Sequence, residues 1–295
     1  MAGVKQITVL GATGSIGQSS LALVRQHPDR FAVHGLVAGK DFNRLAALAH
    51  EFKPKIIGIH DQTNLSALKE LISTLDCQLV AGEAACSEIA AMPVDLVIAG
   101  ISGLAGLPSV MAAVCAGQTV AIANKESLVC AGAMLQARCA AHKTLLLPVD
   151  SEHSALFQAM RGEDAAKISR LILTASGGPF REWTLEQMEK ATPDQAVAHP
   201  NWSMGQRISI DSASMFNKAL EIIEASVLFS MPQESIDVVI HPQSIVHSLV
   251  EFCDGAQIAH MGAPDMRGAI GFALDWPHRQ PLPVKRLDLA SIGRL

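Results

Sequence analysis

The sequence predicts an α/β protein: an N-terminal Rossmann-like doubly wound sheet followed by an α+β domain. Three observations support this prediction. Residues 1–149 alternate short Val/Ile/Leu runs with helical patterns, as in parallel sheets that helices cover. A glycine-rich turn, Gly11–Gly17, follows the first of these runs. From residue 150 a second domain begins, with strand patterns at 168–174 and between 237 and 260.

The composition is that of a folded chain of about two domains. Of its 295 residues, 49% are hydrophobic and 17% are charged, which provides ample material for a core. The formal charge of −5, with no run of Lys or Arg, argues against a nucleic-acid partner. No apolar run reaches membrane-spanning length, and the N-terminus lacks a signal-peptide layout. We therefore expect a cytoplasmic protein with no membrane partner.

Two features of residue usage narrow the class further. The six cysteines show no C-x-x-C spacing, which favours reduced thiols over disulfides. The chain has no tyrosine, which excludes the Tyr-x-x-x-Lys pair of short-chain dehydrogenases.

Seven strands are expected in the first domain, with helices between most of them. The strand candidates are 7–10, 31–37, 56–59, 79–80, 96–100, 119–123 and 144–149. The helical patterns include 42–52, 64–75 and 126–142. The second domain is expected over 150–276, and 277–295 reads as a linker tail containing Pro and Arg.

The turn after the first strand has glycines spaced G-x-x-G-x-x-G and leads into a helix. This is a variant of the dinucleotide fingerprint, in which glycines let the pyrophosphate approach the backbone at a helix N-terminus. A purely structural turn is the alternative. The cofactor contacts expected here are Gly11, Thr13, Gly14, Ser15 and Ile16.

The end of the second strand indicates which dinucleotide is bound. NAD sites usually have an acid there, bonded to the ribose hydroxyls. Here Gly39 is followed by Lys40 and then Asp41, which suits the cap of the next helix. Because Lys40 can pair with a 2′-phosphate, NADP is favoured; a solvated lysine beside a helix cap is the alternative.

Polar residues also follow the strand at 119–123. Asn124, Lys125 and Glu126 place an amide, an ammonium and a carboxylate just past a buried strand. Ligands of doubly wound sheets bind beyond the carboxyl ends of the strands, so a site is expected here. An N-capped helix is the alternative.

Two acids follow the last strand of the first domain. Asp150 and Glu152 are two residues apart, so in extended chain they would face the same way and converge on one hard cation, joined by Glu221. The alternative is two acids at the start of a helix, where the macrodipole favours them.

The stretch His199–Glu224 gathers further polar groups. A loop carries His199 and Trp202, a strand-like run covers 208–210, and Asp211–Ser214 is expected to open a helix. Ser212 would then face an anion at the helix N-terminus. Further along the helix come Asn217, Lys218 and Glu221. A capped amphipathic helix is the alternative.

The second domain contains two other groups of polar residues, a serine in a glycine-rich turn and a pair of histidines. Ser176, in a Ser-Gly-Gly turn after the strand at 168–174, is a further candidate for holding phosphate. His241 and His247 have no carboxylates spaced beside them, so we interpret them as structural or lining residues.

Together, the motifs GATGSIG, NKES, PVDSEHSA, SGGPF and HPNWSMGQRISIDSASMFNKALE resemble the 1-deoxy-D-xylulose 5-phosphate reductoisomerase family, over essentially the whole chain. The resemblance implies NADPH and a divalent cation (Mg²⁺ or Mn²⁺, with Co²⁺ also accepted). It implies conversion of the sugar phosphate 1-deoxy-D-xylulose 5-phosphate to 2-C-methyl-D-erythritol 4-phosphate for isoprenoid synthesis. It also implies a homodimer and a further helical domain after residue 276, and we expect this domain to be absent from the present chain.

The family's functional residues can be placed on matching positions of this sequence. The metal ligands fall on Asp150, Glu152 and Glu221, and the phosphate donors on Ser176, Ser212, Asn217 and Lys218. Lys125 and Ser151 match contacts to substrate oxygens, while His199 and Trp202 match a flap over the substrate. With the three metal ligands, Lys125 and His199 are the expected catalytic residues. Cofactor contacts are expected from Gly39, Lys40, Asp41, Asn124, Glu126, Met204 and Gly205.

Two other functions are compatible with the sequence. A semialdehyde or homoserine-type dehydrogenase shares a Rossmann half and an α+β half. It would need a catalytic cysteine at a helix start, and none of the six cysteines is so placed. A non-catalytic NADP-binding sensor would keep the fold without a working metal site.

Overall fold

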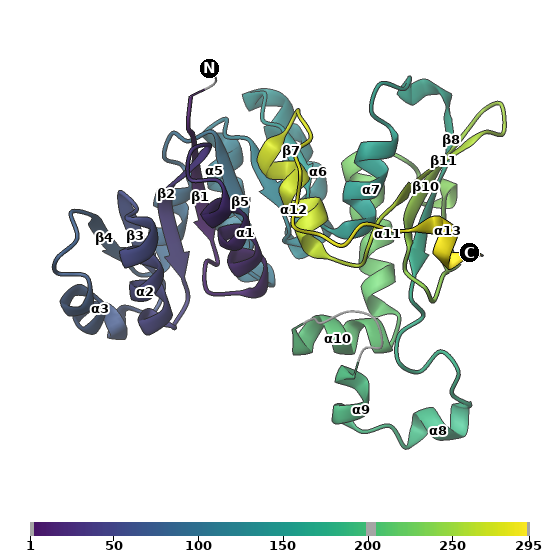
Figure 1. Ribbon diagram of the computed structural model, residues 1–295, viewed down its shortest axis with the longest axis horizontal. Helices are drawn as coiled ribbons and strands as arrows, with labels where there is room; N and C mark the ends of the chain where they lie inside the picture. Colours follow the sequence, from purple (N-terminus) through teal and green to yellow (C-terminus); the bar gives the residue numbers. More distant parts are fainter. Residues whose placement is uncertain (1–2, 199–204, 294–295) are drawn as a thin grey trace. The chain divides into compact units, whose positions relative to one another are not determined.

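The computed structural model describes residues 3–198 and 205–293 (Figure 1). The chain divides into two compact units. The first unit comprises Met1–Val149 and Ile270–Leu282, and the second comprises Asp150–Ala269 and Pro283–Leu295. The α/β fold class predicted from the sequence is confirmed, with a Rossmann-like parallel sheet in the first unit and a mixed sheet in the second.

The first unit is built on a parallel sheet in the order β4-β3-β2-β1-β5-β6-β7. Its strands are β1 (Lys5–Leu10), β2 (Phe31–Ala38), β3 (Ile56–Ile59), β4 (Gln78–Ala81), β5 (Leu96–Ala99), β6 (Val120–Ile122) and β7 (Leu146–Pro148). The strand order changes direction between β1 and β5, and ligands of such sheets bind at that switch point. The glycine turn after β1 and the loop after β5 lie there.

Each strand of this sheet is followed by helix. The α-helices are α1 (Ser15–Gln26), α2 (Phe42–Phe52), α3 (Leu65–Leu71), α4 (Glu83–Ala90), α5 (Leu107–Cys115) and α6 (Lys125–His142), with short 3₁₀ helices at Gln62–Asn64 and Leu104–Gly106. Most of these strands are buried on both faces, which explains why they read as continuous apolar runs, whereas edge strand β4 is partly exposed.

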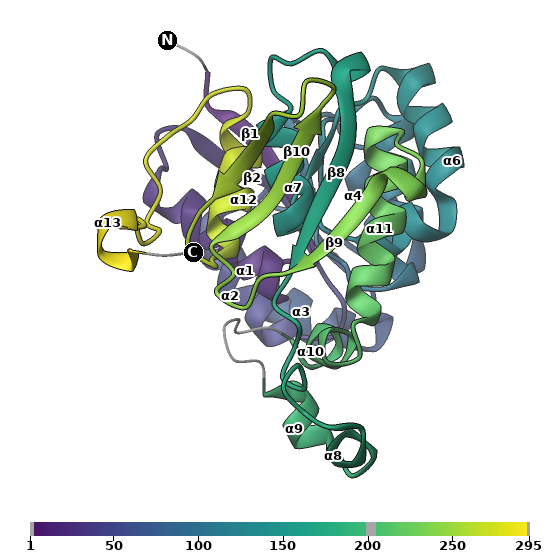
Figure 2. The ribbon, with the colours of Figure 1, turned by 90° about the vertical axis from the view of Figure 1, so that its right-hand side faces the viewer.

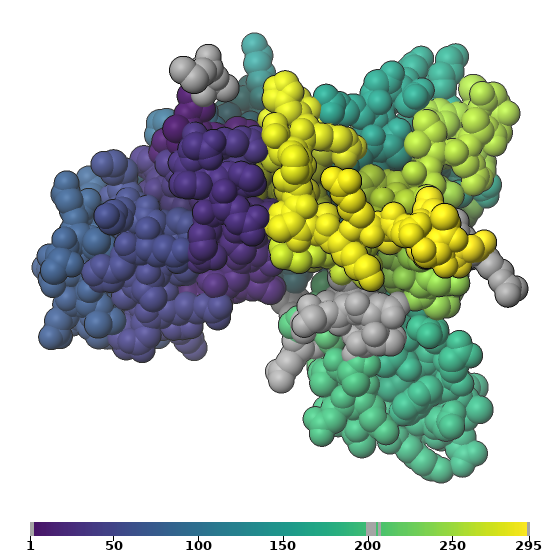
Figure 3. Space-filling model, in the orientation of Figure 1, coloured from purple at the N-terminus to yellow at the C-terminus, as the bar shows by residue number. Residues whose placement is uncertain are grey.

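The chain returns to the first unit through helix α12 (Met266–Asp275). The Lys5 ammonium donates to the main-chain oxygens of Leu274 (2.8 Å) and Trp276 (3.2 Å), at the carbonyl end of this helix. Arg30 pairs with the buried carboxylate of Asp275. In Figure 3 the yellow atoms of the returning segment lie against the purple atoms of the N-terminal region. From the sequence alone, residues 270–276 were expected in the second domain. The contacts of Lys5 and Arg30 with residues 274–276 cannot be predicted from the pattern of residues along the chain.

The second unit contains a four-stranded sheet in the order β11-β10-β8-β9 (Figure 2). Its strands are β8 (Ile168–Ala175), β9 (Ile236–Ile240), β10 (Val246–Phe252) and β11 (Gln257–Met261). Strands β8 and β9 are parallel, and the other two pairs are antiparallel. The other elements are α7 (Ser151–Ala159), α8 (Leu185–Glu189), α9 (Pro193–Val197), α10 (Gln206–Ala213), α11 (Phe216–Phe229), α13 (Leu289–Ile292) and 3₁₀ helices at Ala165–Lys167 and Gln233–Ser235.

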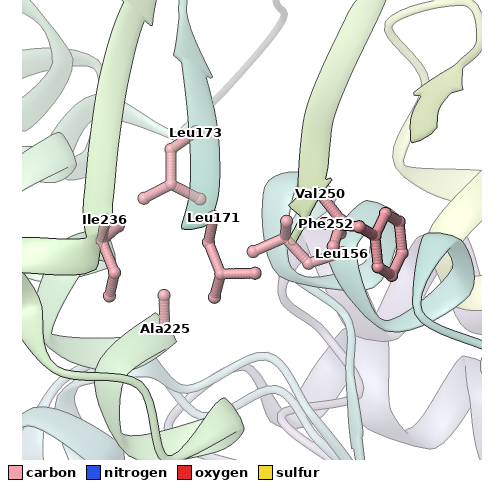
Figure 4. Packing of buried hydrophobic residues seen from close by; sticks show 7 residues of the cluster. All are labelled: Leu156, Leu171, Leu173, Ala225, Ile236, Val250 and Phe252. Atoms are coloured by element: carbon pink, nitrogen blue, oxygen red, sulfur yellow. The ribbon is translucent and has the colours of Figure 1, made fainter. Parts of the chain in front are cut away.

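Helices α7 and α11 pack on the same face of this sheet (Figure 4). Leu156 of α7 and Ala225 of α11 join apolar side chains of three strands in one buried cluster: Leu171, Leu173, Ile236, Val250 and Phe252. Helices α8, α9 and α10 lie beyond one end of the sheet (Figures 1 and 2). The apolar cluster therefore holds α7 and α11 against the sheet through their middle and later turns.

The strand predicted at 208–210 is wrong, because these residues belong to helix α10. Within this helix the polar Ser209 is 1% exposed, whereas the apolar Ile210 is 47% exposed. The helix predicted to open at Asp211 is also wrong: Ser212 lies in the last turn of α10. Met215 is left-handed (φ 59°), and α11 begins after it, at Phe216.

Among the described residues, no helix is both long and apolar enough to span a bilayer.

His247 on β10 packs as the sequence suggested for a structural residue. Its ring is buried, hydrogen-bonded to the main chain of Gly262 and Ala263, and 5.8 Å from the ring of His260. Burial lowers the pKa of His247 below its usual value of 6.5; the nearby His241 acts in the same direction, and the main-chain bonds oppose it.

This shift predicts a pH-dependent stability. Because the folded pKa is depressed, the stabilisation from the neutral ring is present above pH 6.5 and is lost as the pH falls through the folded pKa. Urea unfolding of the wild type and of His247→Gln from pH 8 to pH 5 should give a difference in unfolding free energy that declines in acid. If the difference in unfolding free energy between the wild type and His247→Gln stays constant with pH, the lowered pKa of His247 is contradicted. His142→Gln, at an exposed position, is the control.

Candidate active site

The three predicted acids Asp150, Glu152 and Glu221 lie together in the second unit. Each offers a carboxylate oxygen, and these oxygens lie within 4.8 Å of one another. Asp150 is the N-cap of α7 and accepts from the Ser151 main-chain N–H at 2.9 Å, and Glu152 follows in the first turn. The extended-chain argument for their convergence is therefore wrong. The start of a helix brings them together, and Glu221 of α11 completes the group. An all-oxygen set of this kind fits a hard cation such as Mg²⁺ or Mn²⁺.

The ammonium of Lys218 lies among these carboxylates. Its Nζ donates to Glu152 Oε1 (2.8 Å), to the Thr174 main-chain oxygen (2.6 Å) and, closely, to Glu221. Burial would lower the pKa of Lys218, but the charges of Glu152 and Glu221 more than offset this and raise the pKa above its usual value. The Asn217 amide also donates to the Glu221 carboxylate. Two residues predicted to bind phosphate thus contact a predicted metal ligand.

Sequence reasoning missed His153 and Glu224, which lie next to the acids. His153 is fully buried, with Nε2 2.9 Å from the main-chain oxygen of Glu221 and Nδ1 3.5 Å from Glu224 Oε2. A carbonyl oxygen only accepts, so Nε2 carries a hydrogen. Burial acts to lower the pKa of His153, but the charges of Glu224, Asp150 and Glu221 raise it overall. The signal available was spacing: each residue lies three positions after a predicted ligand, on the same helix face.

The Ser176 turn lies beside Ser212. The Gly178 N–H donates to Ser176 Oγ at 3.2 Å, and both glycines of the turn have positive φ. A Cβ added to Gly178 would lie 2.6 Å from the Ser212 main-chain oxygen, so the two segments are in close contact. Ser151 donates through its hydroxyl to Glu152, and Gly205 is the N-cap of α10. His199, Trp202 and Met204 lie outside the described residues.

In the first unit, the glycine turn has the geometry that close approach requires. Gly11 has φ 79°, and a Cβ there would lie 2.6 Å from the Gly100 oxygen. A Cβ on Gly17 would lie 2.4 Å from the Gly11 oxygen. Gly14 is the N-cap of α1, and Ser15 is its first residue. Gly14 and Ser15 are exposed, whereas Thr13 and Ile16 are half-buried. An exposed helix start after a tight turn can receive a phosphate group.

At the end of β2, Gly39, Lys40 and Asp41 are all exposed. The Asp41 carboxylate accepts from the Arg44 main-chain N–H at 3.0 Å and so caps α2, as the sequence suggested. The Arg44 guanidinium, which sequence reasoning did not consider, donates to Gln18 Oε1 of α1 at 2.8 Å.

Asn124 joins three elements of the first unit. Its Nδ2 donates to the main-chain oxygens of Ile101 (2.7 Å) and Gly103 (2.8 Å), and its Oδ1 accepts from the Ser127 N–H (2.9 Å). The amide therefore caps α6, as the alternative interpretation of an N-capped helix expected. It also holds the loop after β5, which was not expected. Lys125 begins α6 and is nearly buried, and Glu126 lies 3.2 Å from the Asn124 amide.

Two family models match the chain. The model described as 1-deoxy-D-xylulose 5-phosphate reductoisomerase matches residues 7–132, and that of the C-terminal domain of the same enzyme matches residues 146–229. The chain is 52% identical over 292 residues to the reductoisomerase of Bradyrhizobium sp. strain BTAi1, covering 99% of this chain and 72% of the relative. It is 49% identical over 295 residues to that of Prosthecochloris aestuarii, covering 99% and 77%.

Solved structures agree with these matches. A reductoisomerase in complex with NADPH, fosmidomycin and magnesium has a TM-score of 0.95 at 44% identity, covering 98% of this chain and 74% of that one. The Zymomonas mobilis enzyme in complex with NADPH has a TM-score of 0.92 at 44% identity, covering 100% and 76%. An archaeal homoserine dehydrogenase has a TM-score of 0.57 at 11% identity, covering 90% and 95%, which shows a shared fold alone.

Proposed function

The chain belongs to the 1-deoxy-D-xylulose 5-phosphate reductoisomerase family, and on this basis we propose that Asp150, Glu152 and Glu221 bind the divalent cation of its reaction. The protein is an NADPH-dependent oxidoreductase that converts 1-deoxy-D-xylulose 5-phosphate to 2-C-methyl-D-erythritol 4-phosphate in a metal-dependent reaction. Neither the sensor nor the semialdehyde or homoserine-type dehydrogenase is favoured. The single observation that carries the proposed metal site is the convergence of three carboxylates from α7 and α11.

The residues of this site have two proposed roles, metal binding and orientation of the substrate. A cation bound by the three acids supplies positive charge that polarises the substrate carbonyl. We propose Mg²⁺ or Mn²⁺, with Co²⁺ accepted, because every ligand offered is a carboxylate oxygen. Ser151, at the start of α7, and Lys125 are proposed to orient the substrate's oxygens.

The phosphate of the substrate is proposed to bind where the Ser176 turn meets the end of α10 and the start of α11. The hydroxyls of Ser176 and Ser212 and the polar groups of Asn217 and Lys218 belong to these segments. Binding energy from a dianion remote from the reacting carbons holds the substrate in place for the reaction. The flap roles of His199 and Trp202 rest on the family resemblance alone.

NADPH is proposed to bind along the carboxyl ends of β1, β2, β5 and β6. The turn of Gly11, Thr13, Gly14, Ser15 and Ile16 would receive the pyrophosphate. Gly39, Lys40 and Asp41 would border the 2′-phosphate, with Lys40 supplying the charge. Asn124 and Glu126 are proposed to contact the rest of the NADPH molecule. Met204 and Gly205 are proposed as further NADPH contacts.

We further propose that the protein is a homodimer in the cytoplasm. Edge strand β9 exposes Val238, Val239 and Ile240, and an exposed apolar edge favours association with another chain. The six cysteines form no disulfide, as expected for a reducing compartment.

The metal site predicts how Glu152→Gln behaves. With one ligand charge removed, Mg²⁺ or Mn²⁺ affinity should fall by at least about tenfold and turnover should fall with it, whereas NADPH affinity should stay unchanged. The measurements are isothermal titration with Mn²⁺ and NADPH oxidation in the presence of deoxyxylulose phosphate, with and without Mg²⁺. The matched control is Glu189→Gln, at an exposed position. Unaltered metal dependence in Glu152→Gln would remove Glu152 from the site.

The 2′-phosphate proposal predicts the effect of Lys40→Asp. Replacing a cation with an anion should lower the ratio of kcat/KM for NADPH to that for NADH by about tenfold or more. Steady-state kinetics with both cofactors checks it, and Lys69→Asp, on the exposed side of α3, is the control. An unchanged ratio means that another group reads the phosphate, with Arg44 the next to test.

The dimer proposal predicts that Val239→Glu combined with Ile240→Glu weakens association. Placing two charges in an apolar interface should raise the dimer dissociation constant by about a hundredfold or more, as sedimentation equilibrium can measure. Leu185→Glu, exposed on α8, should leave it unchanged. A dimer that persists in the double variant places the interface elsewhere.

A further inference from the structure

Lys218 holds a position that a metal ion would also require. Its ammonium contacts Glu152, Glu221 and the Thr174 main-chain oxygen, all in the second unit. Two of these three partners are proposed metal ligands. The side chain is 7% exposed, so the ammonium is largely withdrawn from water and depends on these oxygens for its hydrogen bonds.

A divalent cation and this ammonium cannot occupy the same oxygens together. Mg²⁺ takes carboxylate oxygens at about 2.1 Å, so an ion shared by Glu152 and Glu221 would stand close to where the ammonium now lies. Two cations that close repel strongly in a buried site, where the effective dielectric is low. Binding the metal therefore requires that the ammonium leave the carboxylates.

A substrate phosphate bound at the site proposed above would offer the ammonium another partner. Thr174, whose main-chain oxygen Lys218 contacts, precedes Ser176 of the phosphate turn by two residues on the same chain. Ser212, whose main chain touches that turn, precedes Lys218 by six residues. A lysine side chain has four rotatable methylene groups, so its ammonium can move between the two places without a change in the backbone.

We propose that Lys218 is an exchangeable counter-ion: a divalent cation displaces its ammonium from Glu152 and Glu221, and the displaced ammonium then binds the substrate's phosphate. This inference rests on the metal and phosphate sites proposed above and adds a coupling between them. Because binding linkage is reciprocal, metal raises the affinity for the phosphate and phosphate raises the affinity for the metal.

The first test measures Mn²⁺ binding to the full chain in the absence of substrate, by isothermal titration. Lys218→Gln removes the competing cation, so Mn²⁺ affinity should rise by about tenfold, a change of about 1.4 kcal/mol. Lys190→Gln removes the same charge from an exposed pair with Glu186 and should leave the affinity unchanged. Unchanged or weaker Mn²⁺ binding in Lys218→Gln overturns the proposal.

The second test uses the wild type, because Lys218→Gln leaves buried carboxylates without their ammonium and can fail to fold. Labelling by an amine-reactive ester, located by mass spectrometry, should increase several-fold at Lys218 when Mg²⁺ is added and should fall again with inorganic phosphate. Labelling at Lys190 should not respond to either. Labelling of Lys218 that Mg²⁺ leaves unchanged or lowers overturns the exchange.

These outcomes separate the exchange from the metal site itself. If Glu152→Gln binds Mn²⁺ as the wild type does, the proposed metal site fails. If Glu152→Gln loses Mn²⁺ affinity while Lys218 neither competes with the metal nor becomes reactive upon its binding, the metal site stands and the exchange alone fails.

Discussion

The second unit depends on the neutralisation of acids that its fold buries. Glu221 and Glu224 are each 1% exposed, and a carboxylate so withdrawn from water is costly unless an opposite charge or hydrogen bonds compensate it. Lys218 contacts Glu221, and the His153 ring lies between Glu224 and the main chain of Glu221. These contacts join the first turns of α7 to α11 at the end of β8. The polar pairing therefore acts with the apolar cluster around Leu156 and Ala225 to fix the two helices in register.

In the first unit, the sheet edge at which we propose that NADPH binds is held by different means. No charge is buried at the turn after β1; instead the backbone of Gly11 approaches that of Gly100 so closely that no side chain fits between them. The loop that contains Gly100 is held in turn by the Asn124 amide, through Ile101 and Gly103. Three strand ends are thus connected by main-chain contacts and one side-chain amide. Such a surface is pre-formed and leaves the N-terminus of α1 exposed to a phosphate.

Most of the architecture could be predicted from the sequence because the strands of the first sheet, apart from the partly exposed edge strand β4, are largely buried apolar runs, and a helix follows each strand. The strand predicted at 208–210 was wrong because a run of three residues is too short to distinguish a strand from a helix. The convergence of Asp150 and Glu152 was expected from an extended chain, whereas a helix start produces it. The contacts of Lys218 with Glu152 and of His153 with Glu224 form only when α7 packs beside α11, because each joins residues of both helices. The spacing of Lys218 from Glu221 along α11 was available in the sequence, but the partners on the other helix were not.

The return of the chain through α12 bears on the order in which the protein is made. Lys5 and Arg30 are among the first residues to leave the ribosome, while their partners Leu274, Asp275 and Trp276 emerge 245 to 271 residues later. During synthesis these contacts form only after residues 150–269 of the second unit have been translated. A nascent chain stopped before Ile270 therefore lacks part of the first unit, although all seven strands of that unit's sheet have already been made.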